Sequence, residues 1–266
     1  MPTKKIIPEF AELVAAIKAN DVSKLESTLA AGVDVNGTDV LGRTLLMTAA
    51  EVGSGSMVKL LLTHRAKLAT RDRLNFHDAG GKTALHRAVQ GRRHEVVQLL
   101  ITAGADMEVR DKLGETALHF SVANGDLPMT DLLLDSGAAP NGSGSTGTPL
   151  TTAAIMGFTN VAKSLLSHGA DPNHPADARR PVLGCAVFAK KPELCRILIT
   201  AGARVDATDH EGRTAMDSVG LTAMPDIRGI KLTSDQMTEL REKVAAAVVI
   251  RSLLLEAGAA EKIYAL

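Results

Sequence analysis

The sequence predicts an all-α repeat solenoid, in which copies of one helix-turn-helix unit with a hairpin-like finger stack side by side. The stretch KTALHRAVQGRRHEVVQLLITAGAD, residues 82–106, reappears as ETALHFSVANGDLPMTDLLLDSGAA, residues 115–139, with each feature displaced by 33 positions. A fixed period of this length is typical of stacked supersecondary units, because each unit buries its apolar face only against its neighbours. The repetition therefore predicts the fold class before any single element is assigned.

Two anchors locate the remaining copies: a threonine, or the residue in its place, and a glycine 21 positions later. Thr83 pairs in this way with Gly104, and Thr116 pairs with Gly137. Extending the same register in both directions predicts about seven repeats. They form a single domain over residues 1–266, with approximate bounds 6–38, 39–71, 78–110, 111–142, 143–175, 176–208 and 209–266, the last with an insertion near 220–236.

The elements follow the same order in each copy. The segment that begins at the threonine, as in TALHRAV, predicts a short first helix, and a polar or Gly-containing break predicts a turn. A segment such as EVVQLLITAG, with apolar residues at helical spacing, predicts the second helix. The glycine just past it can adopt the left-handed conformation that ends a helix. Asp, Asn and Gly before the next DxxGxT pattern predict a hairpin-like finger.

Polar caps are predicted at both ends of the array. Lys18 and Lys24 give the first repeat a polar character, and residues 235–258 predict a long amphipathic helix with a charged face. Thr233 and Gln236 have the spacing of a capping box at the start of this helix. Terminal repeats with a polar outer face keep a stack soluble, so we expect a chain without a further effector domain.

The repeated motifs resemble those of the ankyrin-repeat family. GKTALHRAV, GETALHFSV, TGTPLTTAA, LGRTLLMTAA and EGRTAMDSV, paired with TAGAD, DSGAA, SHGAD or TAGAR, are similar to the T-P-L-H and G-A-D-x-N hallmarks of that family. The resemblance covers the chain from about Glu9 onward. It implies an elongated, curved array and a mostly non-enzymatic module that binds partners with its finger tips and the concave face of its first helices.

Composition excludes several partners. Lysine plus arginine equals aspartate plus glutamate, 30 against 30, and the chain has five Phe, one Tyr and no Trp, so nothing favours nucleic acid. The N-terminus lacks the unbroken apolar core of an export signal, and no apolar run is long enough to span a membrane. Cys185 and Cys195 have neither a disulfide framework nor zinc-ligand spacing. We therefore expect an intracellular protein of the cytoplasm or nucleus, monomeric without its partner, with no metal and no cofactor.

The sequence predicts no catalytic residue. It contains no nucleophile elbow, phosphate-binding glycine loop or paired-carboxylate motif. His86 and His119 occupy the same place in consecutive repeats, so they could be interpreted as a catalytic or metal-binding pair. The resemblance implies a structural role instead, in which this histidine hydrogen-bonds neighbouring loops.

Two departures from the repeat indicate a binding surface. Six residues inserted before Thr83 place Leu74, Phe76 and His77 at a finger tip, where insertions often serve binding; a locally packed loop is the alternative. The position seven past each anchor changes from polar to apolar along the chain, in the order Lys18, Glu51, Gln90, Ala123, Ile155, Phe188 and Leu221. An apolar strip of this kind on a soluble protein often marks a binding site.

We predict a non-catalytic adaptor that binds a partner protein or peptide through its fingers and concave face. The predicted contact residues are Leu41, Arg43, Phe76, Lys82, Lys112, Leu113, Ile155, Met156 and Phe188. The alternative is a small-molecule-binding protein or an enzyme with an apolar concave pocket in repeats 4 to 6. The nearest reactive residues for that alternative are Cys185, His119, Asp217 and Arg179.

Overall fold

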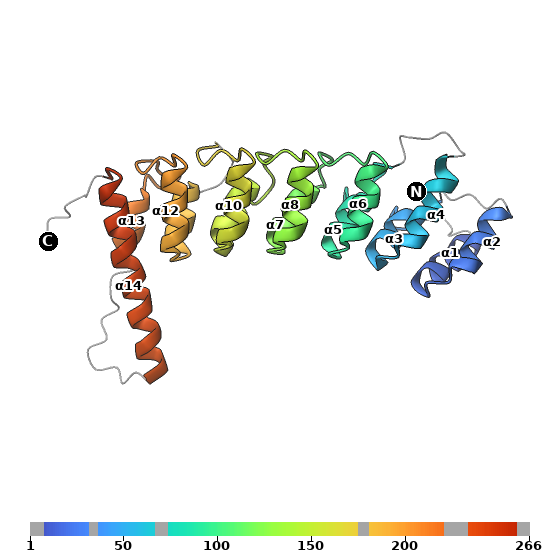
Figure 1. Cartoon of the computed structure of the whole chain (residues 1–266), viewed down its shortest axis with the longest axis horizontal. Helices are drawn as coiled ribbons and strands as arrows, with labels where there is room; N and C mark the ends of the chain where they lie inside the picture. The colour runs from blue at the N-terminus through green and yellow to red at the C-terminus, as the bar shows by residue number, and fades with distance from the viewer. Residues whose placement is uncertain (1–7, 32–36, 67–73, 175–180, 221–233, 260–266) are drawn as a thin grey trace. The chain divides into compact units, whose positions relative to one another are not determined.

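The chain folds into paired helices joined by turns and fingers, as a computed structural model shows (Figure 1). The structure describes residues 8–31, 37–66, 74–174, 181–220 and 234–259. The chain divides into two units, Met1–Ala139 and Pro140–Leu266, which are described in turn. The prediction of a single domain over the whole chain stays a prediction.

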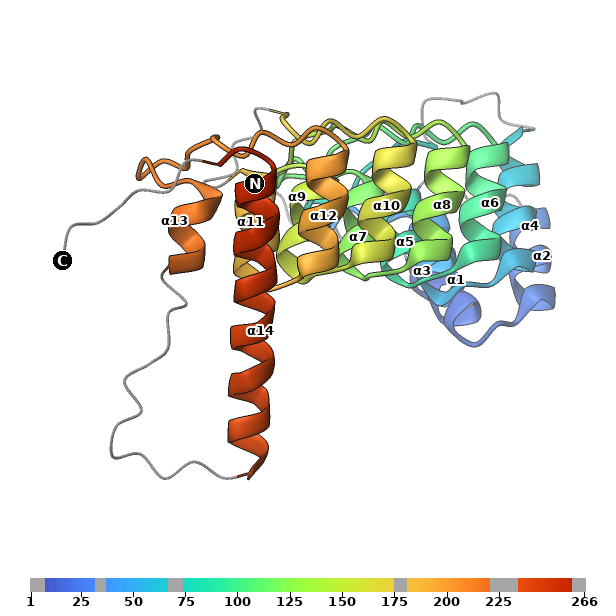
Figure 2. The ribbon, with the colours of Figure 1, turned by 60° about the vertical axis from the view of Figure 1, so that its left-hand side comes forward.

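Unit 1 contains four helix pairs whose order matches the predicted repeats. The first helices of the pairs are α1 (Pro8–Lys18), α3 (Leu45–Val52), α5 (Ala84–Gln90) and α7 (Ala117–Ala123). The second helices are α2 (Val22–Ala30), α4 (Gly55–Ala66), α6 (His94–Thr102) and α8 (Leu127–Asp135). First helices contact first helices along the unit, and α2, α4 and α6 contact one another in sequence, so the pairs form two layers (Figure 2).

Unit 2 continues the same plan with α9 (Pro149–Met156), α10 (Thr159–Ser167), α11 (Val182–Phe188), α12 (Pro192–Thr200), α13 (Ala215–Gly220) and α14 (Ser234–Glu256). The first helices α9, α11 and α13 contact one another in order, and so do the second helices α10, α12 and α14. The predicted all-helical repeat fold is therefore confirmed, with fourteen helices in the described parts of the chain.

The core lies between the two helix layers of each unit. Leu85 and Leu100, on the two helices of one pair, have 1% and 0% of their surface exposed, and Leu165 and Leu198 of unit 2 are fully buried. Leucine and small residues such as Ala88 and Ala153 alternate in these layers, which allows the short helices to pack closely.

Local signals set the ends of the helices. The Thr83 and Thr148 hydroxyl oxygens accept hydrogen bonds from the amides of His86 and Thr151, and thereby cap the starts of α5 and α9. The glycine predicted to end each second helix has a positive φ, as in Gly104 with φ 87°. This part of the prediction is confirmed.

The predicted long C-terminal helix is α14, which contacts α12 and α13. Its buried residues Ile250, Leu253 and Leu254 lie toward its C-terminal end. Figures 1 and 2 show that its other end extends well beyond α12. Thr233 of the predicted capping box and Leu221 of the predicted apolar strip lie outside the described residues.

Candidate functional site

Each described finger with the DxxGxT pattern is a tight turn built around its aspartate. The Asp78 carboxylate accepts hydrogen bonds from the amides of Gly80 at 2.8 Å and Lys82 at 3.0 Å. The Asp78 amide in turn donates to the Lys82 carbonyl at 3.0 Å. The same arrangement occurs at Asp39, Asp111 and Asp209. The repeated aspartate is therefore what shapes the finger.

Three of these carboxylates, those of Asp39, Asp78 and Asp209, have lowered pKa values and are held in their charged form. Burial of Asp78 would raise its pKa, but hydrogen bonds from the Arg87 side chain and from the Lys82 and Gly80 amides outweigh burial and lower the pKa below its usual value. The pKa values of Asp39 and Asp209 are lowered in the same way, by hydrogen bonds that outweigh burial and include an arginine side chain. The finger turns therefore keep their hydrogen bonds at neutral pH.

Neighbouring fingers of unit 1 are hydrogen-bonded to one another. The Ala79 amide donates to the Leu41 carbonyl at 2.8 Å, and the Lys112 amide donates to the Gly80 carbonyl at 3.0 Å. Gly81, with φ 83°, lies where its finger meets the finger that carries Lys112. A Cβ atom at Gly81 would be only 2.8 Å from the Lys112 nitrogen. The bonds hold three finger tips side by side.

The apolar residues predicted at these tips are exposed. Leu41 has 53% of its surface exposed and Leu113 has 62%, and Phe76 is also exposed and stacks on His77. Leu74 of the same insertion is buried, which agrees with the alternative of a locally packed loop. The inserted finger thus combines local packing with an exposed aromatic ring.

Two of the three cationic residues predicted in unit 1 already have partners within the protein. The Arg43 guanidinium lies 2.7 Å from the Asp39 carboxylate and 3.9 Å from Glu51. Lys82 lies over the Phe120 ring, 4.6 Å from its centre. Lys112 is exposed at a finger tip. Of these three, only Lys112 projects from the surface as the sequence suggested.

In unit 2, the predicted apolar residues lie at the C-terminal ends of two adjacent first helices. Ile155 and Met156 end α9, and Phe188 ends α11; all three are exposed, Phe188 by 66%. The contact between α9 and α11 brings these ends into one neighbourhood of unit 2.

His86 is structural in the way that the resemblance implied. His86 Nδ1 lies 3.2 Å from the Thr83 amide, and its Nε2 lies 3.1 Å from the Glu115 carbonyl of the next finger. Burial lowers the pKa of His86, although the bond to Glu115 opposes this shift. His119 is likewise within 3.1 Å of the Thr116 amide.

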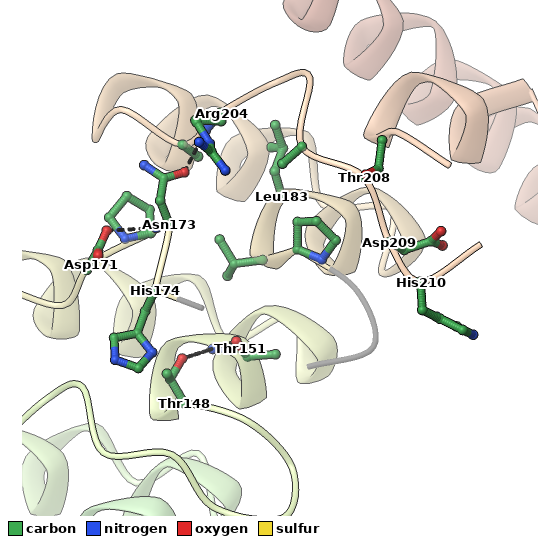
Figure 3. A pocket seen from close by; sticks show the side chains of 15 residues that line it. Thr148, Thr151, Asp171, Asn173, His174, Leu183, Arg204, Thr208, Asp209 and His210 are labelled. Carbon is green, nitrogen blue, oxygen red and sulfur yellow. Dashed lines mark hydrogen bonds between the residues drawn. The ribbon is translucent and has the colours of Figure 1, made fainter. Parts of the chain in front are cut away.

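A cavity of about 290 Å³ opens between two fingers of unit 2 (Figure 3). Its walls come from the starts of α9 and α11 and from the fingers that follow α10 and α12. The lining residues are Thr148, Thr151, Asp171, Pro172, Asn173, His174, Pro181, Val182, Leu183, Ala203, Arg204, Ala207, Thr208, Asp209 and His210. The sequence did not reveal this cavity, which is more polar than the apolar concave pocket of the alternative prediction.

Two of the four reactive residues of that alternative, Cys185 and Asp217, are described residues of unit 2. Cys185 is buried in α11, and Asp217 accepts a hydrogen bond from the Thr214 amide at 2.8 Å. Arg179 lies outside the described residues, and His119 belongs to unit 1. Within the described parts of the chain, no group of three or more His, Cys, Asp or Glu residues could hold a metal ion. No described helix combines the length and the apolar character needed to cross a membrane.

Helix pairs in two layers, joined by hydrogen-bonded fingers, define a helical repeat protein of the binding-module class. The family model described as "Ankyrin repeats (3 copies)" matches residues 13–111 and 93–176. The chain belongs to the ankyrin-repeat family. Domains of this family generally mediate protein-protein interaction.

Several known proteins are similar to parts of the chain. Human cyclin-dependent kinase 4 inhibitor B is 34% identical over 122 residues, which cover 45% of this chain and 88% of that protein. A Caenorhabditis elegans homologue of transient receptor potential cation channel subfamily A member 1 is 31% identical over 130 residues, 48% of this chain but only 11% of the channel. The chain therefore spans most of one relative and a small part of the other.

Solved ankyrin-repeat structures share the fold. The ankyrin repeat domain of Bcl-3 matches with a TM-score of 0.68 at 22% identity, over 86% of this chain and 96% of that one. The human ASB11 ankyrin repeat domain also matches with a TM-score of 0.68, at 21% identity, over 94% and 99%. At this level of identity the likeness supports the fold alone.

Proposed function

We propose that the protein is a non-catalytic adaptor that binds a partner protein or peptide through its finger tips and the exposed ends of its first helices. In unit 1 the contact residues are Leu41, Arg43, Phe76, Lys82, Lys112 and Leu113. In unit 2 they are Ile155, Met156 and Phe188. Arg43 already pairs with the Asp39 carboxylate, and Lys82 already lies over the Phe120 ring. These two residues therefore contribute by keeping those groups in place.

The distribution of exposed apolar side chains carries this proposal. Among the described residues, the exposed large hydrophobic side chains lie on fingers, at the ends of first helices or on α14. None lies on the second helices α2, α4, α6, α8, α10 or α12 as far as these are described. Exposed apolar residues that gather in patches, rather than scatter singly, are typical of interaction sites.

The relatives are consistent with a protein partner. Cyclin-dependent kinase 4 inhibitor B is named for its action on another protein, and the chain matches 88% of its length. In an interface of this kind, a few buried apolar anchors supply most of the binding free energy, and a polar rim surrounds them. Leu41, Leu113 and Phe188 have the exposure that such anchors need before binding.

Native mass spectrometry of the protein gently purified from its host tests the proposal. The wild-type chain is compared with a unit 1 variant, Leu41→Glu with Leu113→Glu, and a unit 2 variant, Ile155→Glu with Phe188→Glu. Val248→Glu with Leu255→Glu on α14 is the matched control, because those side chains are also exposed and apolar. The free energy of unfolding of each variant should stay within about 0.5 kcal/mol of the wild-type value, since surface substitutions rarely cost more.

We expect a second polypeptide to remain bound to the wild type and to the α14 variant. The unit 1 variant, the unit 2 variant or both should lose it. Retention of that polypeptide by both variants would contradict the proposal. A bound small molecule in place of a polypeptide would instead support the alternative function, binding of a metabolite in a pocket.

A further inference from the structure

Two lysines follow the exposed apolar helix ends of unit 2. Lys190 and Lys191 lie in the turn between α11 and α12, shortly after Phe188 at the end of α11. Lys191 is exposed, and Lys190 is partly exposed. Neither ammonium group forms an ion pair or a hydrogen bond with any described residue. Two cations that the described fold does not use therefore lie beside the apolar surface.

Packing fixes the Lys191 side chain against the end of α9. A Cβ atom at Gly157 would lie 2.7 Å from the Lys191 Cε atom and 3.1 Å from its Cγ atom. Gly157 directly follows Met156, the last residue of α9, so the methylene chain of Lys191 crosses the end of that helix. Phe188 ends α11, which contacts α9. The cation and the exposed apolar side chains thus share one surface of unit 2.

The corresponding cation of unit 1 is used within the fold. Arg93 occupies the place of Lys191 in an earlier repeat, ten positions after the anchor. The Arg93 side chain likewise lies against a glycine, Gly53, and its Nε donates to the Glu51 carbonyl at 3.2 Å. Lys191 has the same kind of packing but no hydrogen bond from its ammonium group to a described residue. Its charge is therefore available to a partner.

The backbone at Lys190 would suit glycine better than lysine. Lys190 has φ 54°, in the left-handed region that residues with a Cβ atom disfavour. The corresponding position, nine after the anchor, holds Gly125 or Gly157 in other repeats. Arg92, another cation at this position, donates from its guanidinium to the Asn124 carbonyl at 2.7 Å. Lys190 has no comparable side-chain contact with a described residue, and backbone strain of this kind is typical of functional positions.

The charge around the helix ends is strongly positive. Residues 155–163 and 188–196 contain four cations, Lys163, Lys190, Lys191 and Arg196, and one carboxylate, Glu193. Lys163 and Arg196 lie 3.5 and 3.8 Å from the Glu193 carboxylate, which therefore already has two partners. A partner that carries negative charge would be attracted here, and a basic partner would be repelled. This surface therefore favours a segment that is both apolar and acidic.

We propose that the helix ends of unit 2 bind an extended segment of the protein partner that carries a bulky apolar residue and a Glu or Asp two positions away. The apolar side chain packs on Ile155, Met156 and Phe188, and the carboxylate pairs with Lys190 and Lys191. Alternate side chains of an extended peptide point to the same side, about 6.6 Å apart, so both can face this surface at once. The inference rests on the proposed function and adds the chemistry that unit 2 recognises.

Titration of the full chain with two peptides, followed by nuclear magnetic resonance of the Ile and Met methyl groups, tests the proposal. The first peptide is acetyl-Gly-Glu-Ser-Phe-Ser-Glu-Gly-amide, which offers a carboxylate on either side of the apolar residue. The second has Gln in place of both Glu residues. Lys190→Gly and Lys191→Gln each remove one cation. Lys59→Gln is the matched control, because it removes an exposed lysine of α4 in unit 1 and changes the net charge equally.

We expect the Glu peptide to shift the methyl signals of Ile155 and Met156. It should bind the wild type and Lys59→Gln about fivefold more tightly than the Gln peptide does, since exposed ion pairs are individually weak. This preference should disappear in the double variant, Lys190→Gly with Lys191→Gln, and shrink for the wild type at high salt. Lys190→Gly should melt no lower than the wild type, because glycine adopts the left-handed conformation without strain.

Equal affinity of the wild type for the two peptides would overturn the pairing with the lysines. If Phe188→Ala still abolishes that binding, the apolar surface and the proposed function stand. An undiminished preference in the double variant, or methyl shifts confined to other residues, would also overturn the inference. Binding of neither peptide would do the same, and the native mass spectrum then decides whether the proposed function fails with it. Dimerisation of the wild type in sedimentation, lost in Phe188→Ala, would assign the surface to a second copy of the chain instead.

Discussion

Gly81→Ala should destabilise the protein far more than Gly104→Ala, because only the first substitution forces two fingers apart. Both glycines have a positive φ, 83° and 87°. A Cβ atom at Gly104 would meet nothing within 4 Å, whereas one at Gly81 would lie 2.8 Å from the Lys112 nitrogen and 2.9 Å from the Asp111 Cα. The pair therefore shares the backbone strain and differs in the clash.

The shared strain is small. The left-handed conformation costs a non-glycine residue about 1–2 kcal/mol, and the loss of chain entropy in the unfolded state offsets about 0.4–1 kcal/mol of it. Gly104→Ala should therefore lower the free energy of unfolding by about 1 kcal/mol. Gly81→Ala adds overpacking, about 1–3 kcal/mol, and weakens the bond from the Lys112 amide to the Gly80 carbonyl. Its total should be about 3 kcal/mol.

Urea unfolding of the two variants, followed by circular dichroism, measures the difference. At equal m-values, the midpoint for Gly81→Ala should fall well below that for Gly104→Ala. Gly81→Ala should also weaken capture of the partner, because the displaced finger carries Lys112 and Leu113. Equal midpoints for the two variants would refute the close contact between fingers, and with it the argument that the tips are held as one surface.

Three further outcomes follow from individual side chains. Thr83→Ala should lower the free energy of unfolding by about 1 kcal/mol in urea, through loss of the cap on α5. Because burial lowers the pKa of His86, its stabilising effect is present above its unfolded value of about 6.5 and is lost as pH falls toward the folded value. The urea midpoint of the wild type should therefore drop more between pH 7.5 and 5.5 than that of His86→Gln, and an equal drop would contradict this. Burial raises the pKa of Cys195 to about 12, so iodoacetamide at pH 8 should modify it only after unfolding, as peptide mass mapping would show.

Periodicity made the helices predictable, since a period of 33 fixes where each helix begins once one copy is understood. The threonine caps and the positive φ of Gly104 follow from the same local rules, and they agree with the structure. The role of His86 followed from the family resemblance, and its bonds to Thr83 and Glu115 confirm it.

The candidate site was only partly predictable, because it depends on contacts between residues distant in sequence. The exposure of Leu113 and Phe188 followed from register, whereas the insertion has no register to follow, so the sequence left open whether Leu74 is packed locally or exposed. The sequence did not show that the Arg43 guanidinium pairs with the Asp39 carboxylate and lies near Glu51, because these contacts form only on folding. The cavity was missed for the same reason, as Thr151, His174 and Arg204 come together from three separate segments.

Folding alone gives no reason for the apolar residues at the finger tips. Leu85 and Leu100 have almost no exposed surface and supply the burial that holds a helix pair together. Leu113 keeps 62% of its surface exposed at a tip whose shape is already fixed by the Asp111 carboxylate and by the bond from Lys112 to Gly80. A polar residue there would serve the fold equally and would favour solubility. In the complex that we propose, the partner would bury this leucine, which folding leaves exposed.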